Sequence, residues 1–148
     1  MEHKQLLTVF NSLPVGIGFF TADGTLVRCN ESFCRIFGAD SQTLLGNKLN
    51  INENSVVPDV VKEAVRRCVP VQMSFLYDFD KQRTDKRFFS TRTRTCYLKC
   101  NGNPLYDNDG KFVNYIFIFE DITETVKSEE VLRQSRRKTE LAMKAANI

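Results

Sequence analysis

The feature that most constrains this chain is an abrupt change from a strand pattern to a helix pattern near residue 120. Residues 116–119 are bulky and β-prone, which predicts a strand buried on both faces. Asp121 follows at once, and its carboxylate can accept hydrogen bonds from the free N–H groups of a helix start, with Glu124 at the spacing of a capping box. We therefore predict a strand that leads directly into a helix, which suits signalling better than catalysis.

The composition indicates one globular domain with an appendage. The chain has 148 residues, of which 42% are hydrophobic and 26% charged. Twelve Phe and no Trp predict either an aromatic core or a pocket walled by rings. A net charge of +3 is too small to indicate a nucleic-acid partner. No apolar run approaches the roughly 20 residues that span a bilayer, so we expect no membrane insertion, and without a signal peptide we expect a cytoplasmic protein.

The residues that usually carry chemistry are few. The single histidine, His3, lies near the terminus, and the cysteines have no CxxC spacing, so no metal site is predicted. We expect the five cysteines to be free, small thiols in a reducing compartment. The chain has no Gly-rich phosphate loop and no nucleophile with a usable histidine, so we do not expect an enzyme. The cysteines are Cys29, Cys34, Cys68, Cys96 and Cys100.

Local patterns predict the order of the elements. Apolar residues at helical spacing predict a lead-in helix over residues 5–13, and an Asp-Gly turn at 23–24 predicts a hairpin of two strands. Asn30 is placed to cap a short helix over residues 32–37. Further elements are a short helix capped by Ser41, a helix over 56–68 with Pro58 in its first turn, a strand over 70–79, a loop over 80–87, a strand that either contains a bulge or begins near Thr95, and a strand over 112–119. This order favours an α+β fold with an antiparallel sheet.

Several short segments stand in a characteristic order along residues 5–124. They are Leu-Pro-Val-Gly-Ile at 13–17, Asp-Gly at 23–24, Asn-Glu-Ser-Phe at 30–33, Ile-Phe-Gly at 36–38, Leu-Gly at 45–46, Gly-Asn-Pro-Leu at 102–105, Asp-Gly at 109–110 and Asp-Ile-Thr-Glu at 121–124. No single segment is specific, but their order and spacing are, and the closing Asp-Ile-Thr is the most telling. Together they resemble a PAS domain, the small sensor module of bacterial signalling proteins.

The resemblance implies a five-stranded antiparallel sheet of order 2-1-5-4-3 with helices on one face. The chain would divide into a lead-in helix (1–13), a PAS core (14–123) and a C-terminal signalling helix (124–148). Residues 132–148 resemble a linker helix and the opening of another PAS domain, so the whole protein would be a multi-PAS sensor histidine kinase. The expected partners are a second copy, bound through helical segments, and a downstream PAS or kinase domain of the same chain.

The resemblance also suggests where a small organic ligand would bind, between the sheet and the helices. Residues 56–68 contain no haem-ligating histidine, and Cys34-Arg35 lacks the rest of a flavin-adduct motif, so no cofactor is predicted. Arg92 or Arg94 would either pair with a ligand carboxylate or lie in solvent. The alternative to a pocket is a core that the rings simply fill. The candidate pocket residues are Phe33, Phe37, Val61, Val65, Met73, Phe75, Phe117 and Phe119.

Two functions are therefore compared. In the first, the module couples ligand binding or dimer state to an output domain through its C-terminal helix. In the second, a filled core only dimerises and relays. In both, Asp121, Thr123 and Glu124 are the expected coupling residues, with Asp121 capping the helix and Thr123 tying its first turn to the sheet edge.

Overall fold

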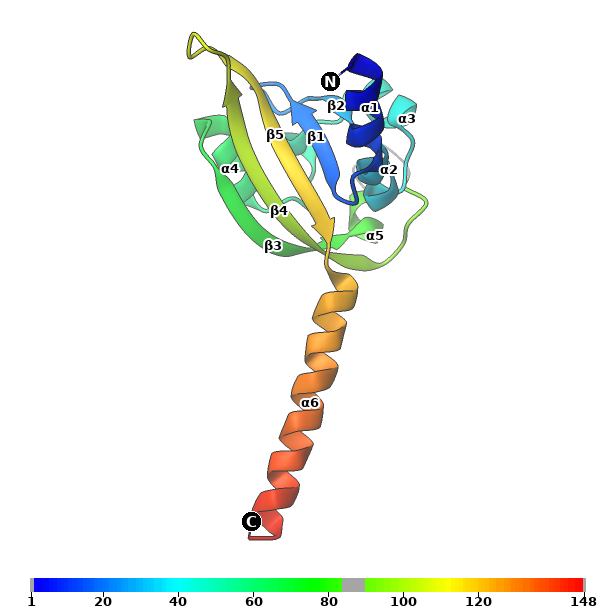
Figure 1. The fold of residues 1–148 in the computed structure, drawn as a ribbon, viewed down its shortest axis with the longest axis vertical. Coiled ribbons are helices and arrows are strands. Elements are labelled where there is room, and N and C mark those ends of the chain that lie inside the picture. The colour runs from blue at the N-terminus through cyan, green and yellow to red at the C-terminus, as the bar shows by residue number, and fades with distance from the viewer. Residues whose placement is uncertain (1, 84–89, 148) are drawn as a thin grey trace.

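The computed structural model describes residues 2–83 and 90–147 (Figure 1). The elements in chain order are α1 (His3–Ser12), β1 (Gly16–Phe20), β2 (Leu26–Cys29), α2 (Glu31–Phe37), α3 (Ser41–Gly46), the 3-10 helix η1 (Ile51–Glu53), α4 (Asp59–Arg67), β3 (Val71–Asp78), α5 (Phe79–Gln82), β4 (Thr95–Tyr106), β5 (Phe112–Asp121) and α6 (Thr123–Ala145).

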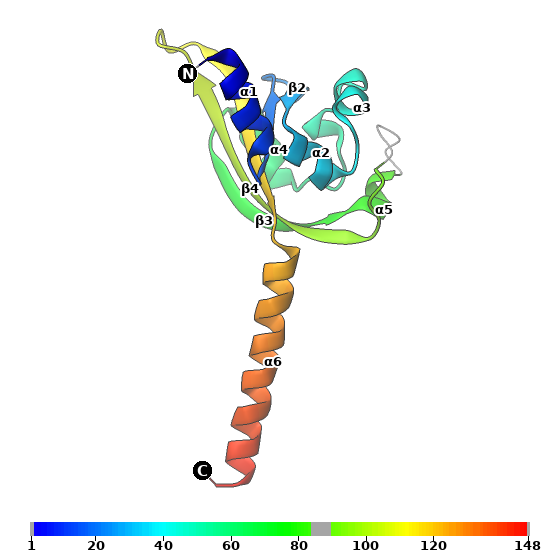
Figure 2. The same ribbon diagram turned by 45° about the vertical axis from the view of Figure 1, so that its right-hand side comes forward.

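One five-stranded sheet organises the domain, in the order β2-β1-β5-β4-β3, and all neighbouring strands are antiparallel. Helices α2, α3 and α4 cover one face, α1 lies on the other side beside β1, and α6 projects away from the sheet (Figures 1 and 2). The predicted α+β class and strand order are confirmed. Because β5 is the central strand and runs into α6, the helix begins at the middle of the sheet.

The outer face of β5 is more open than its sequence suggested. Tyr115, Phe117 and Phe119 point into the core and are buried, but Ile116 is only half-buried and Ile118 is 36% exposed. The prediction of a strand buried on both faces is therefore wrong. Bulky β-prone residues report strand propensity, whereas burial depends on what packs over each face. The helices that fill the core cover only the inner face of β5.

Asn30 connects three elements around the start of α2, and its predicted role as an N-cap is confirmed. Its Oδ1 accepts hydrogen bonds from the backbone N–H of Phe33 at 3.0 Å and of Ile17 at 2.8 Å. Its Nδ2 donates to the carbonyl oxygens of Phe10 at 2.9 Å and Val15 at 3.0 Å. A buried amide with every group paired fixes α2 against both β1 and α1.

Two helix starts differ from the prediction. Asp40, one residue before the predicted cap Ser41, accepts the hydrogen bond from Thr43 N at 2.7 Å and caps α3. Helix α4 begins at Asp59, immediately after Pro58, and not at residue 56. Proline disfavours helical geometry in the residue before it, so the apolar residues at 56 and 57 pack on the core from a loop.

The segment between β3 and β4 contains a helical turn where a loop was predicted. Asp78 accepts hydrogen bonds from the N–H groups of Asp80 and Lys81 and caps α5. The rest of the predicted loop, residues 84–87, and the first two residues of the ambiguous segment before β4 lie outside the described residues. Strand β4 begins at Thr95, directly after Arg94 with its positive φ of 64°, which agrees with the later of the two predicted strand starts.

Candidate functional site

Asp121 lies at the junction of β5 and α6. Its Oδ1 accepts hydrogen bonds from the backbone N–H of Thr123 at 3.0 Å and from the Thr123 hydroxyl at 2.5 Å. The helix begins at Thr123, so Asp121 stands one position before the N-cap residue, Ile122, whose own side chain makes no cap bond. Asp121 still satisfies one free N–H group of the helix start, which is the task of a capping carboxylate.

The predicted capping box at this helix start is wrong. It required Glu124 to be the third helical residue, but Glu124 is the second, because α6 begins at Thr123. No hydrogen bond joins the Glu124 side chain to this turn within the described residues. Its carboxylate still lies in the first turn, where negative charge is favoured by the helix dipole.

Thr123 and Ile122 fasten the same junction to β4. The Thr123 Oγ1 accepts a hydrogen bond from Tyr97 N at 3.0 Å, and Ile122 N donates to Tyr97 O at 2.9 Å. The base of α6 is thus bonded to the central strand that leads into it and to the neighbouring strand. A helix start held in this way cannot swivel without breaking these hydrogen bonds.

Arg92 joins this junction to helix α2. Its Nη1 donates to the carbonyl oxygen of Ile36 at 2.9 Å and lies 3.1 Å from Asp121 Oδ2. Its guanidinium stands over the Phe79 ring, 4.8 Å from the centroid. The side chains of Arg92 and Asp121 are 32% and 29% exposed, so the pair is partly shielded from solvent. Arg92 therefore has internal partners, unlike in either predicted alternative, ligand pairing or full solvation.

The environment of Asp121 keeps its carboxylate ionised. Burial raises the pKa of Asp121, but the hydrogen bonds from Thr123 and the contact with Arg92 outweigh it, so the pKa lies below its ordinary value. At neutral pH the junction therefore contains a carboxylate with a cation on one side and a helix start on the other. These contacts can hold one conformation of the junction.

Sequence reasoning named Asp121 and Thr123 but missed the link through Arg92. The Asp-Gly turn at 109–110 is the one sequence signal that could have found it. Counting back along the hairpin from that turn pairs Leu98 with Glu120, and the register shift between Leu105 and Tyr106 moves the pairing by one residue, to Asp121. Either register brings the residues before β4 close to the base of α6. The coupling role of Asp121, Thr123 and Glu124 stays a prediction.

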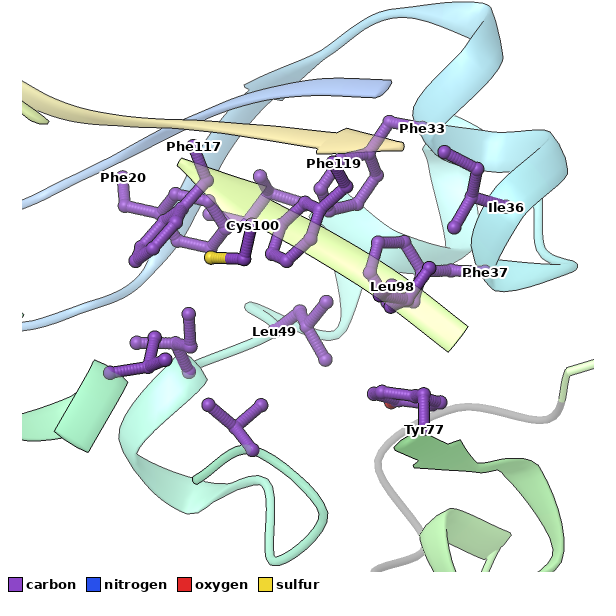
Figure 3. Close-up of a cluster of buried hydrophobic side chains, with 14 of the residues drawn as sticks. Phe20, Phe33, Ile36, Phe37, Leu49, Tyr77, Leu98, Cys100, Phe117 and Phe119 are labelled. Carbon is purple, nitrogen blue, oxygen red and sulfur yellow. The ribbon is translucent and has the colours of Figure 1, made fainter. Parts of the chain in front are cut away.

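The eight candidate pocket residues gather between the sheet and the helices. Phe33 and Phe37 have ring centroids 4.6 Å apart, and Phe37 lies 5.2 Å from Phe119 (Figure 3). Met73 and Phe75 are half-buried and pack against the cluster edge. The other buried members are Val61, Val65 and Phe117.

Little space is left inside this cluster. The cavity among Phe20, Phe33, Phe37 and Tyr77 measures about 20 Å³, close to the volume that one water needs. Beside it, Asn54 Nδ2 donates to the Tyr77 hydroxyl at 2.8 Å, a buried polar contact that the apolar pattern did not predict. Ligand pockets are usually about 300–1,000 Å³, so the rings fill this conformation of the core.

Residues 2–83 and 90–147 contain no group of three His, Cys, Asp or Glu side chains placed to hold a metal ion. No helix in the same part of the chain is long and apolar enough to cross a membrane.

Comparison with known proteins gives one family match and many structural matches. The family model described as "PAS fold" matches residues 10–127. An RNA-binding light-oxygen-voltage receptor has 18% identity and a TM-score of 0.67, over 94% of this chain and 38% of that one. A PAS domain from Colwellia psychrerythraea has 16% identity and a TM-score of 0.61, over 82% and 97%. A domain of a sensory box sensor histidine kinase/response regulator from Geobacter sulfurreducens has 15% identity and a TM-score of 0.54, over 80% and 92%.

These identities show a shared fold alone. The chain spans 38% of the length of the light-oxygen-voltage receptor, so that receptor has further parts. No curated protein matches the chain.

Proposed function

Because the chain belongs to the PAS family of sensory modules, we propose that it is a relay PAS domain, which passes the state of its core to a downstream domain through α6. One observation supports this most directly. Arg92 contacts both the last turn of α2 and Asp121, and the base of α6 is hydrogen-bonded to β4. A shift of α2 would therefore reach the helix through short, partly shielded polar contacts.

The filled core favours the relay function over ligand sensing. A small organic ligand would have to displace rings that now touch each other around a cavity of about 20 Å³. The free energy that separates two packings of such a core must be only a few kcal/mol for a modest input to select between them. Ligand binding by the eight candidate residues is the second candidate function, and it requires such an expanded packing.

Helix α6 is shaped to engage a partner. Its 23 residues extend about 34 Å at the usual rise per residue. None of them is buried, although Val131, Leu132, Leu141 and Met143 are large and apolar. We propose that a second copy of the chain pairs with this helix, and that α6 continues into a PAS or kinase domain. A sensor histidine kinase is the proposed output, since PAS domains of similar fold come from such kinases.

The test uses the full-length protein with Asp121→Ala. We expect the variant to fold and to lose most of its stimulus-dependent change in output, because the carboxylate that joins Arg92 to the first turn of α6 is gone. Glu120→Ala is the matched control, since Glu120 is exposed, adjacent and acidic. An unchanged stimulus response in Asp121→Ala would count against the relay function.

The ligand alternative has a separate test. Native mass spectrometry of the protein purified from cells would show a retained small molecule if the core holds one. We expect the mass of the bare chain. A stoichiometric adduct that is lost on substituting Phe37 with Trp would favour the ligand-sensing function, because Phe37 lies in the middle of the cluster.

A further inference from the structure

Two cysteines that are separate in the chain meet at the junction of β2 and α2. The Sγ atoms of Cys29 and Cys34 lie 3.9 Å apart. Cys29 is the last residue of β2, and Asn30 then caps α2, so the first turn of the helix brings Cys34 back over the strand end. Both positions are held by this cap and by regular secondary structure, so the contact between the thiols is built into the local fold.

The pair is open to reagents from solvent. Both cysteines are half-buried, and they lie in the wall of an open surface hollow of about 520 Å³, together with Asn11, Glu31 and Arg35. Cys96 and Cys100 point into the core and are buried. Two thiols in contact and accessible from one hollow differ from thiols that only fill space.

We propose that Cys29 and Cys34 form a reversible disulfide, and that this makes α2 sensitive to oxidants. A disulfide has an S–S distance of about 2.05 Å, so the two sulfur atoms must approach by roughly 1.8 Å. The approach moves the first turn of α2 relative to β2. The pair is distinct from the candidate pocket and from the α6 junction.

The oxidant class that fits is a hydroperoxide. The thiolate of one cysteine attacks the peroxide, the O–O bond breaks, and a sulfenic acid forms while water or an alcohol leaves. The second thiol attacks the sulfenic sulfur, the S–S bond forms, and a further water leaves. The two sulfurs lose two electrons in total, which reduce the peroxide, and a low-molecular-weight dithiol reverses the reaction.

The environment sets the rate of this chemistry. Burial, and then the proximity of Cys34, raise the pKa of Cys29 to about 12. Burial and the charges of Asp40 and Glu31 also raise the pKa of Cys34, but the hydrogen bond with Cys29 and the charge of Arg35 lower it, and its pKa is raised less than that of Cys29. Cys34 is therefore the attacking thiol and Cys29 the resolving one. Because both thiols are mostly protonated at neutral pH, the pair responds slowly to sustained oxidation.

A shift of α2 would be passed to the rest of the domain through a hydrogen bond and through ring contacts. Cys34 lies two residues before Ile36, whose carbonyl oxygen accepts the hydrogen bond from Arg92. Phe33 and Phe37, on either side of Cys34, lie 6.0 and 5.2 Å from the ring of Phe119. Closing the disulfide would act on the last turn of α2 and on the strand that leads into α6.

The test is a peptide map of the whole chain after mild oxidation. The folded protein is treated with hydrogen peroxide, denatured, alkylated with N-ethylmaleimide and digested with trypsin, which cuts after Arg28 and Arg35 and leaves both cysteines in peptide 29–35. We expect this peptide to lose the mass of two hydrogen atoms, to resist alkylation and to recover after dithiothreitol. Cys68→Ser is the control that keeps the pair, and Cys34→Ser removes it.

The second measurement is hydrogen exchange of reduced and oxidised protein. We expect altered amide protection in α2 and at residues 121–126, and no oxidant-dependent difference in Cys34→Ser. The proposal is overturned if peptide 29–35 stays doubly alkylated, if the oxidant yields only sulfinic acid or adducts at single cysteines, or if the disulfide forms and exchange in α2 is unchanged.

Discussion

Replacing Asp121 with Ala tests the central physical claim about the junction. The carboxylate accepts two hydrogen bonds from Thr123 and pairs with Arg92. Losing a helix-start acceptor costs about 1 kcal/mol, and losing a partly exposed ion pair costs about 0.2–1 kcal/mol. We therefore expect the free energy of unfolding to fall by about 1–2 kcal/mol, which is small beside the usual 5–15 kcal/mol of a domain.

This loss is measurable by thermal unfolding followed by circular dichroism. For a chain of this size, about 1–2 kcal/mol corresponds to a decrease in Tm of roughly 3–8 °C. Asp121→Asn should show a smaller decrease, because the amide oxygen can still accept from Thr123 while the charge next to Arg92 is lost. Glu120→Ala removes an exposed carboxylate that makes no such contacts within residues 2–83 and 90–147, so it should leave the Tm close to that of the parent.

The pH dependence of stability tests the sign of the electrostatic contribution that Asp121 makes to the free energy of unfolding. Because the folded-state pKa of Asp121 lies below its ordinary value, the ionised carboxylate stabilises the fold at pH values above the unfolded pKa of about 4. That contribution is lost as the pH falls through the folded-state pKa. The difference in Tm between the parent and Asp121→Asn should thus be largest near pH 7 and shrink below pH ~4.

A specific result would refute this reasoning. If Asp121→Ala melts at the parent temperature at pH 7, the contacts at the junction do not stabilise the start of α6. If the difference between the parent and Asp121→Asn grows as the pH falls, the carboxylate is not held in its ionised form.

Three further substitutions test other contacts. Gly16→Ala should lower the free energy of unfolding by about 1–3 kcal/mol, measured by urea denaturation, because an added Cβ would lie 2.9 Å from the Cα of Phe33. Tyr77→Phe should cost about 1–2 kcal/mol in the same assay, since Asn54 Nδ2 loses a buried acceptor. Thr123→Val should speed amide exchange in the first turn of α6, whereas Thr123→Ser should preserve it, because only the hydroxyl bonds the β4 amide.

The local features of the chain were predictable from short stretches of sequence. The turn at 23–24, the cap at Asn30 and the alternation of apolar residues in β3 depend on neighbours a few positions away, and the structure has each of them. The carboxylate at Asp121 was predicted for the same reason. The exact helix starts were less predictable, because Asp40 and Ser41 are both good caps and only one can occupy the position.

The composition of the candidate pocket was predictable, but its state was not. The resemblance to a PAS domain placed Phe33, Phe37 and Phe119 in the candidate pocket, and all three are buried. Whether such rings enclose a ligand cavity or fill it depends on their rotamers and on how closely the helices approach the sheet. Those are properties of the packed core, and they left a cavity of about 20 Å³.

The chain's own residue order thus dictated most of the elements, α5 excepted, and that α6 follows β5 without a loop, since propensity, capping and periodicity act over a few residues. Two other features depended on tertiary packing: the open outer face of Ile118 and the contact of Arg92 with Asp121. Both depend on how elements pack: which helices cover the sheet, and how β4 pairs with β5. Short-range sequence patterns carry no information on these packing arrangements, so only the assembled fold sets them.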